Sequence, residues 1–291
     1  MEVLIVTKPT NFEQYGDLVR SMLRRGPSHS DLLAELEQAH REHYSCLNSL
    51  KSELDAAGIH YDEVARSSLP ELTKPYAGVF TVGGDGTLLS ASRLVKDRSP
   101  VIGVRSSTAS VGFLCAIAAP QVKQAVNLFK ANQLKFEETA RLMATIHSAA
   151  DGQVTTTVPV LNDFLFANTN PAATTRYRIA HGEKFEIQKS SGVWISTPVG
   201  STAAILAAGG KTMDRSDRRF QFVVRELYRG EGLPFQLVYG FFNPDHMAFS
   251  IENRSENALL ALDGQRETIP LRYADRLEFK RAPSLLIAKA V

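Results

Sequence analysis

The sequence has 291 residues, of which 44% are hydrophobic and 22% are charged, as in a folded globular protein long enough for two domains. A net charge of +2 and the lack of a basic tract interleaved with aromatic residues argue against a nucleic-acid-binding protein. No apolar stretch is long enough to cross a membrane, so no membrane partner is expected. The two cysteines, Cys46 and Cys115, show no metal-binding spacing and are expected to be reduced.

The first 133 residues alternate between expected strands and expected helices. Apolar runs predict strands at residues 3–6, 79–82 and 101–104, and residues 59–65 are a further candidate strand. Helical patterns lie between and after them, at residues 12–25, 30–57 and 121–132. This alternation predicts an α/β domain over residues 1–133, built on a doubly wound parallel sheet with ligands at the carboxyl ends of its strands.

The pattern changes near Leu134, where short alternating segments rich in β-forming residues begin. Expected strands follow at residues 141–147, 154–160, 176–179, 184–188, 192–196, 236–242, 247–251, 258–262 and 276–280. We therefore predict a β-rich second domain over residues 134–291, with its last strands as candidates to return to the first domain.

The functional prediction centres on residues 78–89, Gly-Val-Phe-Thr-Val-Gly-Gly-Asp-Gly-Thr-Leu-Leu. An apolar strand runs into a glycine-rich loop and then into a helix. Glycines let a ligand approach the backbone, and free N–H groups at a helix start attract phosphate. Asp85 would repel a phosphate unless it holds a metal ion, binds a hydroxyl or removes its proton, which are all uses found in phosphoryl transfer. The alternative is that Asp85 only caps the helix.

A second candidate is the pair Asn162 and Asp163, which lies inside an apolar run. Burying both side chains would be costly unless ligands or backbone groups satisfy them. An amide can bind a base edge and a carboxylate can bind a ribose diol, so the pair suits a nucleoside. An Asx turn at a strand end explains the same residues equally well.

The third candidate is residues 196–204, Ser-Thr-Pro-Val-Gly-Ser-Thr-Ala-Ala, ahead of an expected helix at residues 203–208. Hydroxyl and N–H groups gather there, which suits a nucleotide contact or, equally, an ordinary capped helix. Further along, Asp263 and Gly264 predict a hairpin turn.

These motifs, taken together and in this order, resemble those of the NAD kinases. The likeness runs from Val3 to the last expected strands. Ser190-Ser191-Gly192, and the long charged insertion before Gly58, look most like the mitochondrial-type branch of that family. The glycine-rich loop alone is shared with diacylglycerol-type lipid kinases and phosphofructokinases, whereas the full ordered set is more specific.

The resemblance implies that NAD binds between the two domains and that ATP, with a divalent metal expected to be magnesium, is the phosphoryl donor. It implies phosphorylation of the 2′-hydroxyl of the adenosine ribose, with Asp85 as general base or hydroxyl-orienting carboxylate. It implies a phosphate loop of Gly83, Gly84, Gly86 and Thr87. It implies dinucleotide contacts from Asn162, Asp163, Thr197, Ser201, Thr202 and Ala203. No residue is assigned as a metal ligand.

Two departures from the family pattern leave the details of dinucleotide recognition open. Most bacterial members carry Tyr where this chain has Ala204, and the family's Gly- and Asn-rich loop is replaced at residues 105–112. The alternatives are therefore a lipid or small-alcohol kinase with the same loop, or a non-catalytic dinucleotide-binding protein. Family members form homodimers or homotetramers, so self-association is expected. A cytoplasmic location is expected because no targeting leader is visible.

Overall fold

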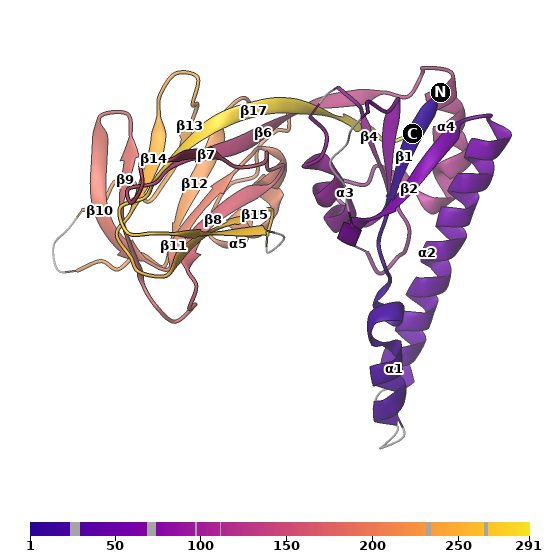
Figure 1. The fold of residues 1–291 in the computed structure, drawn as a ribbon, viewed down its shortest axis with the longest axis horizontal. Helices are drawn as coiled ribbons and strands as arrows, with labels where there is room; N and C mark the ends of the chain where they lie inside the picture. Colours follow the sequence, from indigo (N-terminus) through magenta and orange to yellow (C-terminus); the bar gives the residue numbers. More distant parts are fainter. Residues whose placement is uncertain (24–29, 69–73, 97, 111, 231–233, 265–266) are drawn as a thin grey trace. The chain divides into compact units, whose positions relative to one another are not determined.

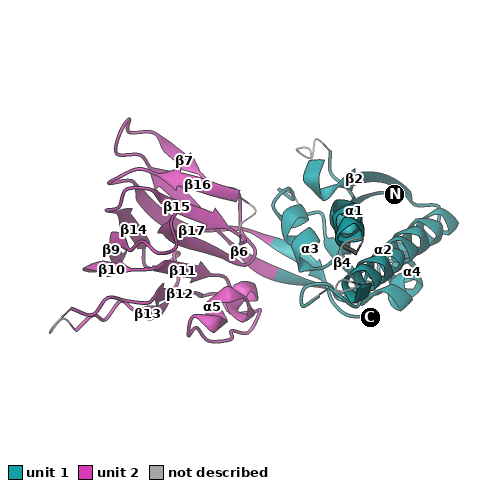
Figure 2. Cartoon of the chain, turned by 90° about the horizontal axis from the view of Figure 1, so that it is seen from below, with its two compact units in different colours: residues 1–138, 285–291 teal, residues 139–284 magenta. Residues whose placement is uncertain are grey.

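The computed structural model describes residues 1–23, 30–68, 74–96, 98–110, 112–230, 234–264 and 267–291. It divides into two compact units, shown in Figure 2: unit 1 comprises residues 1–138 and 285–291, and unit 2 comprises residues 139–284. Each unit has its own cluster of buried apolar side chains.

Unit 1 is built on a parallel sheet. Its strands, in spatial order, are β2 (His60–Ala65), β1 (Glu2–Thr7), β3 (Gly78–Gly83), β4 (Val101–Arg105) and β5 (Ile117–Ala118), all paired in parallel. The last residues of β17 (Arg276–Ala288) also belong to unit 1, where Ile287 pairs in parallel with Val101 of β4.

The helices of unit 1 are α1 (Asn11–Leu23), α2 (Ser30–Ala56), α3 (Asp85–Ser92) and α4 (Val122–Lys130), with short 3₁₀ helices at Arg66–Ser68 and Ala119–Gln121. Apolar side chains of α2 and α4 pack with those of β1, β3 and β4 in one core. Helix α3 lies on the opposite side of these strands (Figures 1 and 2). The apolar stripe of α2 is buried only over its second half, from His43 to Leu54, and α1 runs beside the first half (Figure 1).

Unit 2 contains two antiparallel layers. The first has the order β13 (Tyr239–Phe242), β12 (Phe220–Arg225), β11 (Gly192–Ser196), β8 (Asp163–Asn168), β15 (Ala258–Leu262) and β16 (Glu267–Leu271). The second has the order β10 (Lys184–Ser190), β9 (Thr175–His181), β14 (Phe249–Asn253) and β17, and β6 (Phe136–His147) pairs with β17 and with β7 (Val154–Thr156). A 3₁₀ helix (Val199–Thr202) and α5 (Ala204–Ala207) complete the unit.

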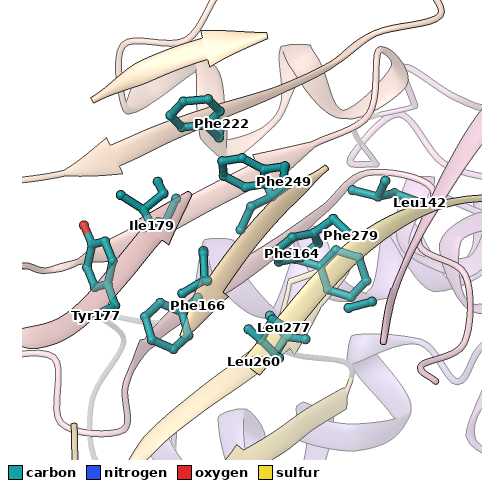
Figure 3. Close-up of a cluster of buried hydrophobic side chains, with 14 of the residues drawn as sticks. Leu142, Phe164, Phe166, Tyr177, Ile179, Phe222, Phe249, Leu260, Leu277 and Phe279 are labelled. Atoms are coloured by element: carbon teal, nitrogen blue, oxygen red, sulfur yellow. The ribbon is translucent and has the colours of Figure 1, made fainter. Parts of the chain in front are cut away.

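Aromatic side chains fill the core of unit 2. Figure 3 shows Phe164 and Phe166 of β8 beside Tyr177 of β9, Phe249 of β14 and Phe279 of β17. All five are at most 2% exposed. Large buried rings of this kind dominate the energetics of a core, and this core includes β8 and β11, whose ends carry the candidate residues.

The predicted fold class is confirmed, with a parallel α/β unit followed by a β-rich unit. Strands β11 and β15 have the bounds predicted from the sequence, but β12 and β16 were not predicted. Gln221, which is fully buried, interrupts the apolar residues of β12, so the sequence shows neither a continuous apolar run nor a regular polar–apolar alternation. The expected helix at 203–208 is shorter, because Gly209 follows in a left-handed conformation (φ 93°). None of the helices described here has both the length and the apolar character needed to span a bilayer.

Candidate functional site

The glycine-rich loop lies at the carboxyl end of β3, whose six residues are all buried. The strand ends at Gly83 and α3 begins at Asp85, so the loop is a direct strand-to-helix turn. A side chain at Gly83 would overlap the hydroxyl of Thr87, which explains why glycine is needed there. The prediction of a buried strand, a tight turn and a helix start is thus met at every position of the motif.

The carboxylate of Asp85 is fixed by a second loop, which follows β4. Its Oδ1 accepts a hydrogen bond from the Leu114 N–H (2.8 Å) and its Oδ2 accepts one from the Phe113 N–H (3.0 Å). The Cys115 thiol also hydrogen-bonds to Asp85, and burial together with the Asp85 charge raises the pKa of that thiol to about 12. Asp85 is therefore bound to the neighbouring loop. A carboxylate has about four acceptor positions, so Asp85 can still accept a further hydrogen bond or bind a metal ion.

The residues that hold Asp85 directly follow the loop at 105–112, which departs from the family pattern. The Ser106 N–H donates to the Gly83 carbonyl (3.1 Å), which joins this loop to the glycine-rich one. A side chain at Gly112 would come within 2.7 Å of Cδ of Arg105, so a small residue is needed where the loop packs on that arginine. Val111 lies outside the described residues.

Thr87 of the glycine-rich loop has a buried side-chain hydroxyl without a hydrogen-bond partner among the described residues. It is 1% exposed, and its Oγ1 has no hydrogen-bond partner within the part of the chain that the structure describes. An unpaired buried hydroxyl lowers stability, and Thr81, inside β3, carries a second one within the described chain.

Lys8 is a residue that sequence analysis missed. It follows β1, and its Cδ lies 3.7 Å from the position that a side chain at Gly83 would take. It lines a cavity of about 280 Å³ with His43, Ser106 and Ser110. Burial, and then the charge of Arg66, lower the pKa of Lys8. The signal was weak because nothing in the sequence relates the end of the first strand to a loop 75 residues later.

The Asn162–Asp163 pair begins β8 in unit 2, where Asp263 holds its backbone. One oxygen of Asp263 accepts from the Asn162 N–H (2.7 Å), and the Asp263 N–H donates to the Asp163 carbonyl (2.9 Å). The other oxygen of Asp263 accepts from the Leu161 N–H (3.3 Å). The Asp-Gly turn is therefore more than a hairpin connection, since its carboxylate sets the geometry of a candidate site 100 residues earlier.

The two side chains of the pair differ in their surroundings. Asp163 is 3% exposed, and burial, followed by the charge of Asp263, raises its carboxyl pKa to about 7. The Asn162 side chain is half-buried and makes no hydrogen bond to other described residues. Asn162 is therefore free to bind a ligand through its amide, and Asp163 carries a proton over much of the range in which most aspartates are ionised.

The segment 196–203 packs directly on Asn162. The Asn162 carbonyl accepts from the Thr197 N–H (2.9 Å) and from the Ser196 hydroxyl (3.2 Å). Gly200 lies against the Asn162 backbone so closely that a side chain there would overlap it. The structure thus brings together two motifs that are separated by more than 30 residues.

The hydroxyls of this segment point in different directions. The Thr197 hydroxyl donates to the Leu161 carbonyl, and the Ser201 hydroxyl donates to the Pro198 carbonyl (2.6 Å). Thr197 and Ser201 are both fully buried, whereas Thr202 is exposed and Ala203 is half-buried. Thr197 and Ser201 therefore shape the turn, and Thr202 and Ala203 are accessible to a ligand.

Comparisons with known proteins agree with these motifs. Residues 19–133 match the family model described as the ATP-NAD kinase N-terminal domain, which includes the glycine-rich loop. The chain is 28% identical over 281 residues to a probable NADH kinase of Oryza sativa subsp. japonica, covering 89% of this chain and 85% of that protein. It is 29% identical over 223 residues to the NAD kinase of Aquifex aeolicus, covering 75% of this chain and 78% of that protein.

The fold also has a solved counterpart. An NAD kinase from Archaeoglobus fulgidus, in complex with ATP, superposes with a TM-score of 0.70 at 15% sequence identity, covering 99% of this chain and 94% of that chain. The family match, the relatives aligned over most of their length and the shared fold agree with the ordered motifs. This chain is similar in sequence and in fold to NAD and NADH kinases over most of its length, and residues 19–133 match the NAD kinase N-terminal domain.

Proposed function

We propose that this protein transfers the γ-phosphoryl group of ATP to the 2′-hydroxyl of the adenosine ribose of NAD, which yields NADP and ADP. The observation that carries the proposal is the fixed carboxylate of Asp85 in a glycine-rich loop at the carboxyl end of a buried strand. The similarity to the relatives described above supports it, since they are named NAD and NADH kinases.

In the proposed reaction the 2′-oxygen forms a bond to the γ-phosphorus, and the bond from that phosphorus to the β–γ bridging oxygen breaks. Asp85 orients the hydroxyl and accepts its proton. A carboxylate held by backbone N–H groups does not need to reorganise, and most of the acceleration in phosphoryl transfer comes from such positioning.

The donor would lie along the glycine-rich loop. Gly83, Gly84 and Gly86 would let phosphate oxygens approach the backbone, and the buried hydroxyl of Thr87 follows them in the chain. Mg²⁺ is usually held by one or two carboxylates together with substrate phosphates and water, so the Asp85 carboxylate suits such an ion. Magnesium would neutralise the charge that develops on the transferred group.

The dinucleotide would bind to unit 2 through Asn162, Asp163, Thr202 and Ala203, with Thr197 and Ser201 fixing the turn. Asn162 is the strongest candidate for direct contact, because its amide makes no hydrogen bond to the rest of the described chain. Assembly of identical chains and a cytoplasmic location complete the proposal, and both rest on the expectations from the sequence.

A phosphoryl-transfer assay with NAD, ATP and Mg²⁺ tests this function, with NADP followed through an NADP-specific dehydrogenase. We expect NADP to form only when all three are present. Parallel reactions with NADH, and with a diacylglycerol in place of NAD, compare acceptors. Phosphorylation of the lipid without formation of NADP would show that the protein is a lipid kinase and not an NAD kinase. The named relatives do not favour that alternative.

A further inference from the structure

Unit 2 has a cavity of about 560 Å³ at the end of β8 that is remote from Asn162 and Asp163. Asn168, the last residue of β8, lines this cavity, whereas Asp163 is the first residue of the same strand. At the usual rise of a strand, the two ends are separated by about 17 Å. The cavity is therefore separate from the candidate dinucleotide contacts of this unit.

Two arginines line the cavity: Arg176 of β9, and Arg254, which directly follows the neighbouring strand β14. Tyr177 of β9 pairs with Asn253 of β14, and both are fully buried. Because side chains alternate along a strand, the adjacent arginines lie on the opposite, outer face. The Arg254 N–H donates to the Arg176 carbonyl (2.9 Å), so the two guanidinium groups extend from neighbouring backbone positions.

The charges along this row are unusual for an antiparallel sheet. On the other side of Arg176, Lys189 of β10 is its strand partner, so three cations lie in one row across β10, β9 and the residue that follows β14. Like charges directly opposite each other destabilise a sheet. The next row of the same face alternates in sign, because Arg178 is opposite Glu252 and Glu252 is opposite Arg276.

The three cations are compensated unequally. Arg254 pairs with Glu252 (3.0 Å), and the Lys189 ammonium lies over the ring of Tyr228 (5.0 Å from its centroid). Arg176 is exposed and forms no ion pair with any residue that the structure describes. A phosphate bound between Arg176 and Arg254 would offset this repulsion, and the planar guanidinium fork matches phosphate geometry.

The rest of the cavity presents groups for hydroxyls and a ring. The Asn168 side chain donates to the Glu256 carbonyl (3.1 Å) and accepts from the Asn170 N–H (2.9 Å), which fixes one wall. The carboxylate of Glu256 supplies acceptors, and Tyr273 offers a ring that is 63% exposed. The volume is within the range of small-molecule sites.

We propose that this cavity binds a mononucleotide, with its phosphate on Arg176 and Arg254, its ribose hydroxyls on Glu256 and its base against Tyr273. The site does not depend on the kinase function, since none of its residues belongs to the candidate kinase residues. The lining residues offer no group that would select one base. A pyrimidine nucleotide is therefore a suitable probe, because a surface specific for adenine would not bind it.

Isothermal titration calorimetry with UMP on the full chain tests the proposal, with uridine and inorganic phosphate as partial probes. We expect saturable binding of UMP, weaker binding of both partial probes, and a loss of affinity of about tenfold or more in Arg176→Gln. Arg178→Gln is the matched control, because it removes an equal charge from the same strand and face; its affinity should stay within about twofold. Tyr273→Ala should also weaken UMP binding, and this residue lies outside the strands of the sheet.

Three results would overturn the site. The first is that the wild-type chain shows no saturable binding of UMP at millimolar concentration. The second is that Arg176→Gln and Arg178→Gln lose the same amount of affinity for UMP. The third is that the wild-type chain binds UMP and uridine with equal affinity. Equal melting temperatures of the variants and the wild type establish that any loss reflects the site and not the fold.

Discussion

At the scale of single residues, Asp163 couples the candidate dinucleotide site to pH. Its folded-state carboxyl pKa of about 7 lies above the ordinary value for an aspartate, because it is buried beside Asp263. Between the unfolded and folded pKa values the native state therefore binds more protons than the unfolded state. The contribution of Asp163 to stability is present at low pH and is lost as pH rises through its folded pKa.

The corresponding prediction compares wild type with Asp163→Asn by urea unfolding between pH 5 and pH 8. The free energy of unfolding of the wild type should fall relative to the variant as pH rises, with a slope of at most about 1.4 kcal/mol per pH unit. A difference that is independent of pH would show that Asp163 is ionised in the folded protein throughout this range.

Thr87 offers a test that separates a structural hydroxyl from a functional one. Replacing it by valine removes a buried hydroxyl without a partner, so the variant should be more stable, by about 1 kcal/mol. If the hydroxyl binds phosphate, kcat/KM for ATP should fall by about tenfold.

Thr81→Val is the matched control, because Thr81 is also fully buried with an unpaired hydroxyl but lies inside β3. It should raise stability to a similar degree and leave kcat/KM unchanged. Unchanged kinetics in Thr87→Val as well would remove this hydroxyl from the phosphate site.

At the scale of elements, the close contact of the 3₁₀ helix Val199–Thr202 with the start of β8 should be sensitive to volume. Gly200→Ala places a methyl group against the Asn162 backbone, and we expect a loss of about 1–3 kcal/mol in the free energy of unfolding. NAD should also bind more weakly, because the shift moves Asn162. Gly230→Ala, whose added carbon would meet only ordinary contacts, should change stability by less than about 0.5 kcal/mol. Equal effects of the two substitutions would contradict the close packing at Gly200.

Elements marked by local signals could be predicted from the sequence, and those defined by distant contacts could not. The strand and turn at Gly83 to Asp85 follow from an apolar run and glycines. Strand β12 could not be found, since Gln221 interrupts its apolar run without setting up a regular alternation. The hydrogen bonds of Asp263 to the backbone at Asn162 span 101 residues, and no local pattern reports them. The support of Asp85 by Phe113 and Leu114 was missed for the same reason.

At the scale of the whole molecule, the candidate residues are divided between two units with separate cores. The proposed phosphate loop and Asp85 belong to unit 1, and the proposed dinucleotide contacts belong to unit 2. Substitutions in the two units should therefore affect different kinetic constants. Asn162→Ala should mainly raise KM for NAD, whereas changes at Asp85 should mainly lower kcat, and steady-state kinetics with each substrate varied would distinguish the two. A raised KM for ATP in Asn162→Ala would contradict this division.

The central claim is that Asp85 acts on the reacting hydroxyl, and Asp85→Asn tests it most directly. The amide keeps the size of the side chain but cannot accept a proton as a carboxylate does. The measurement is kcat for NADP formation in wild type and variant, together with the rise in melting temperature that NAD causes in each. We predict a kcat lowered by about a hundredfold or more with the NAD-induced stabilisation retained. A variant with wild-type kcat would contradict the assignment of Asp85 to the reaction.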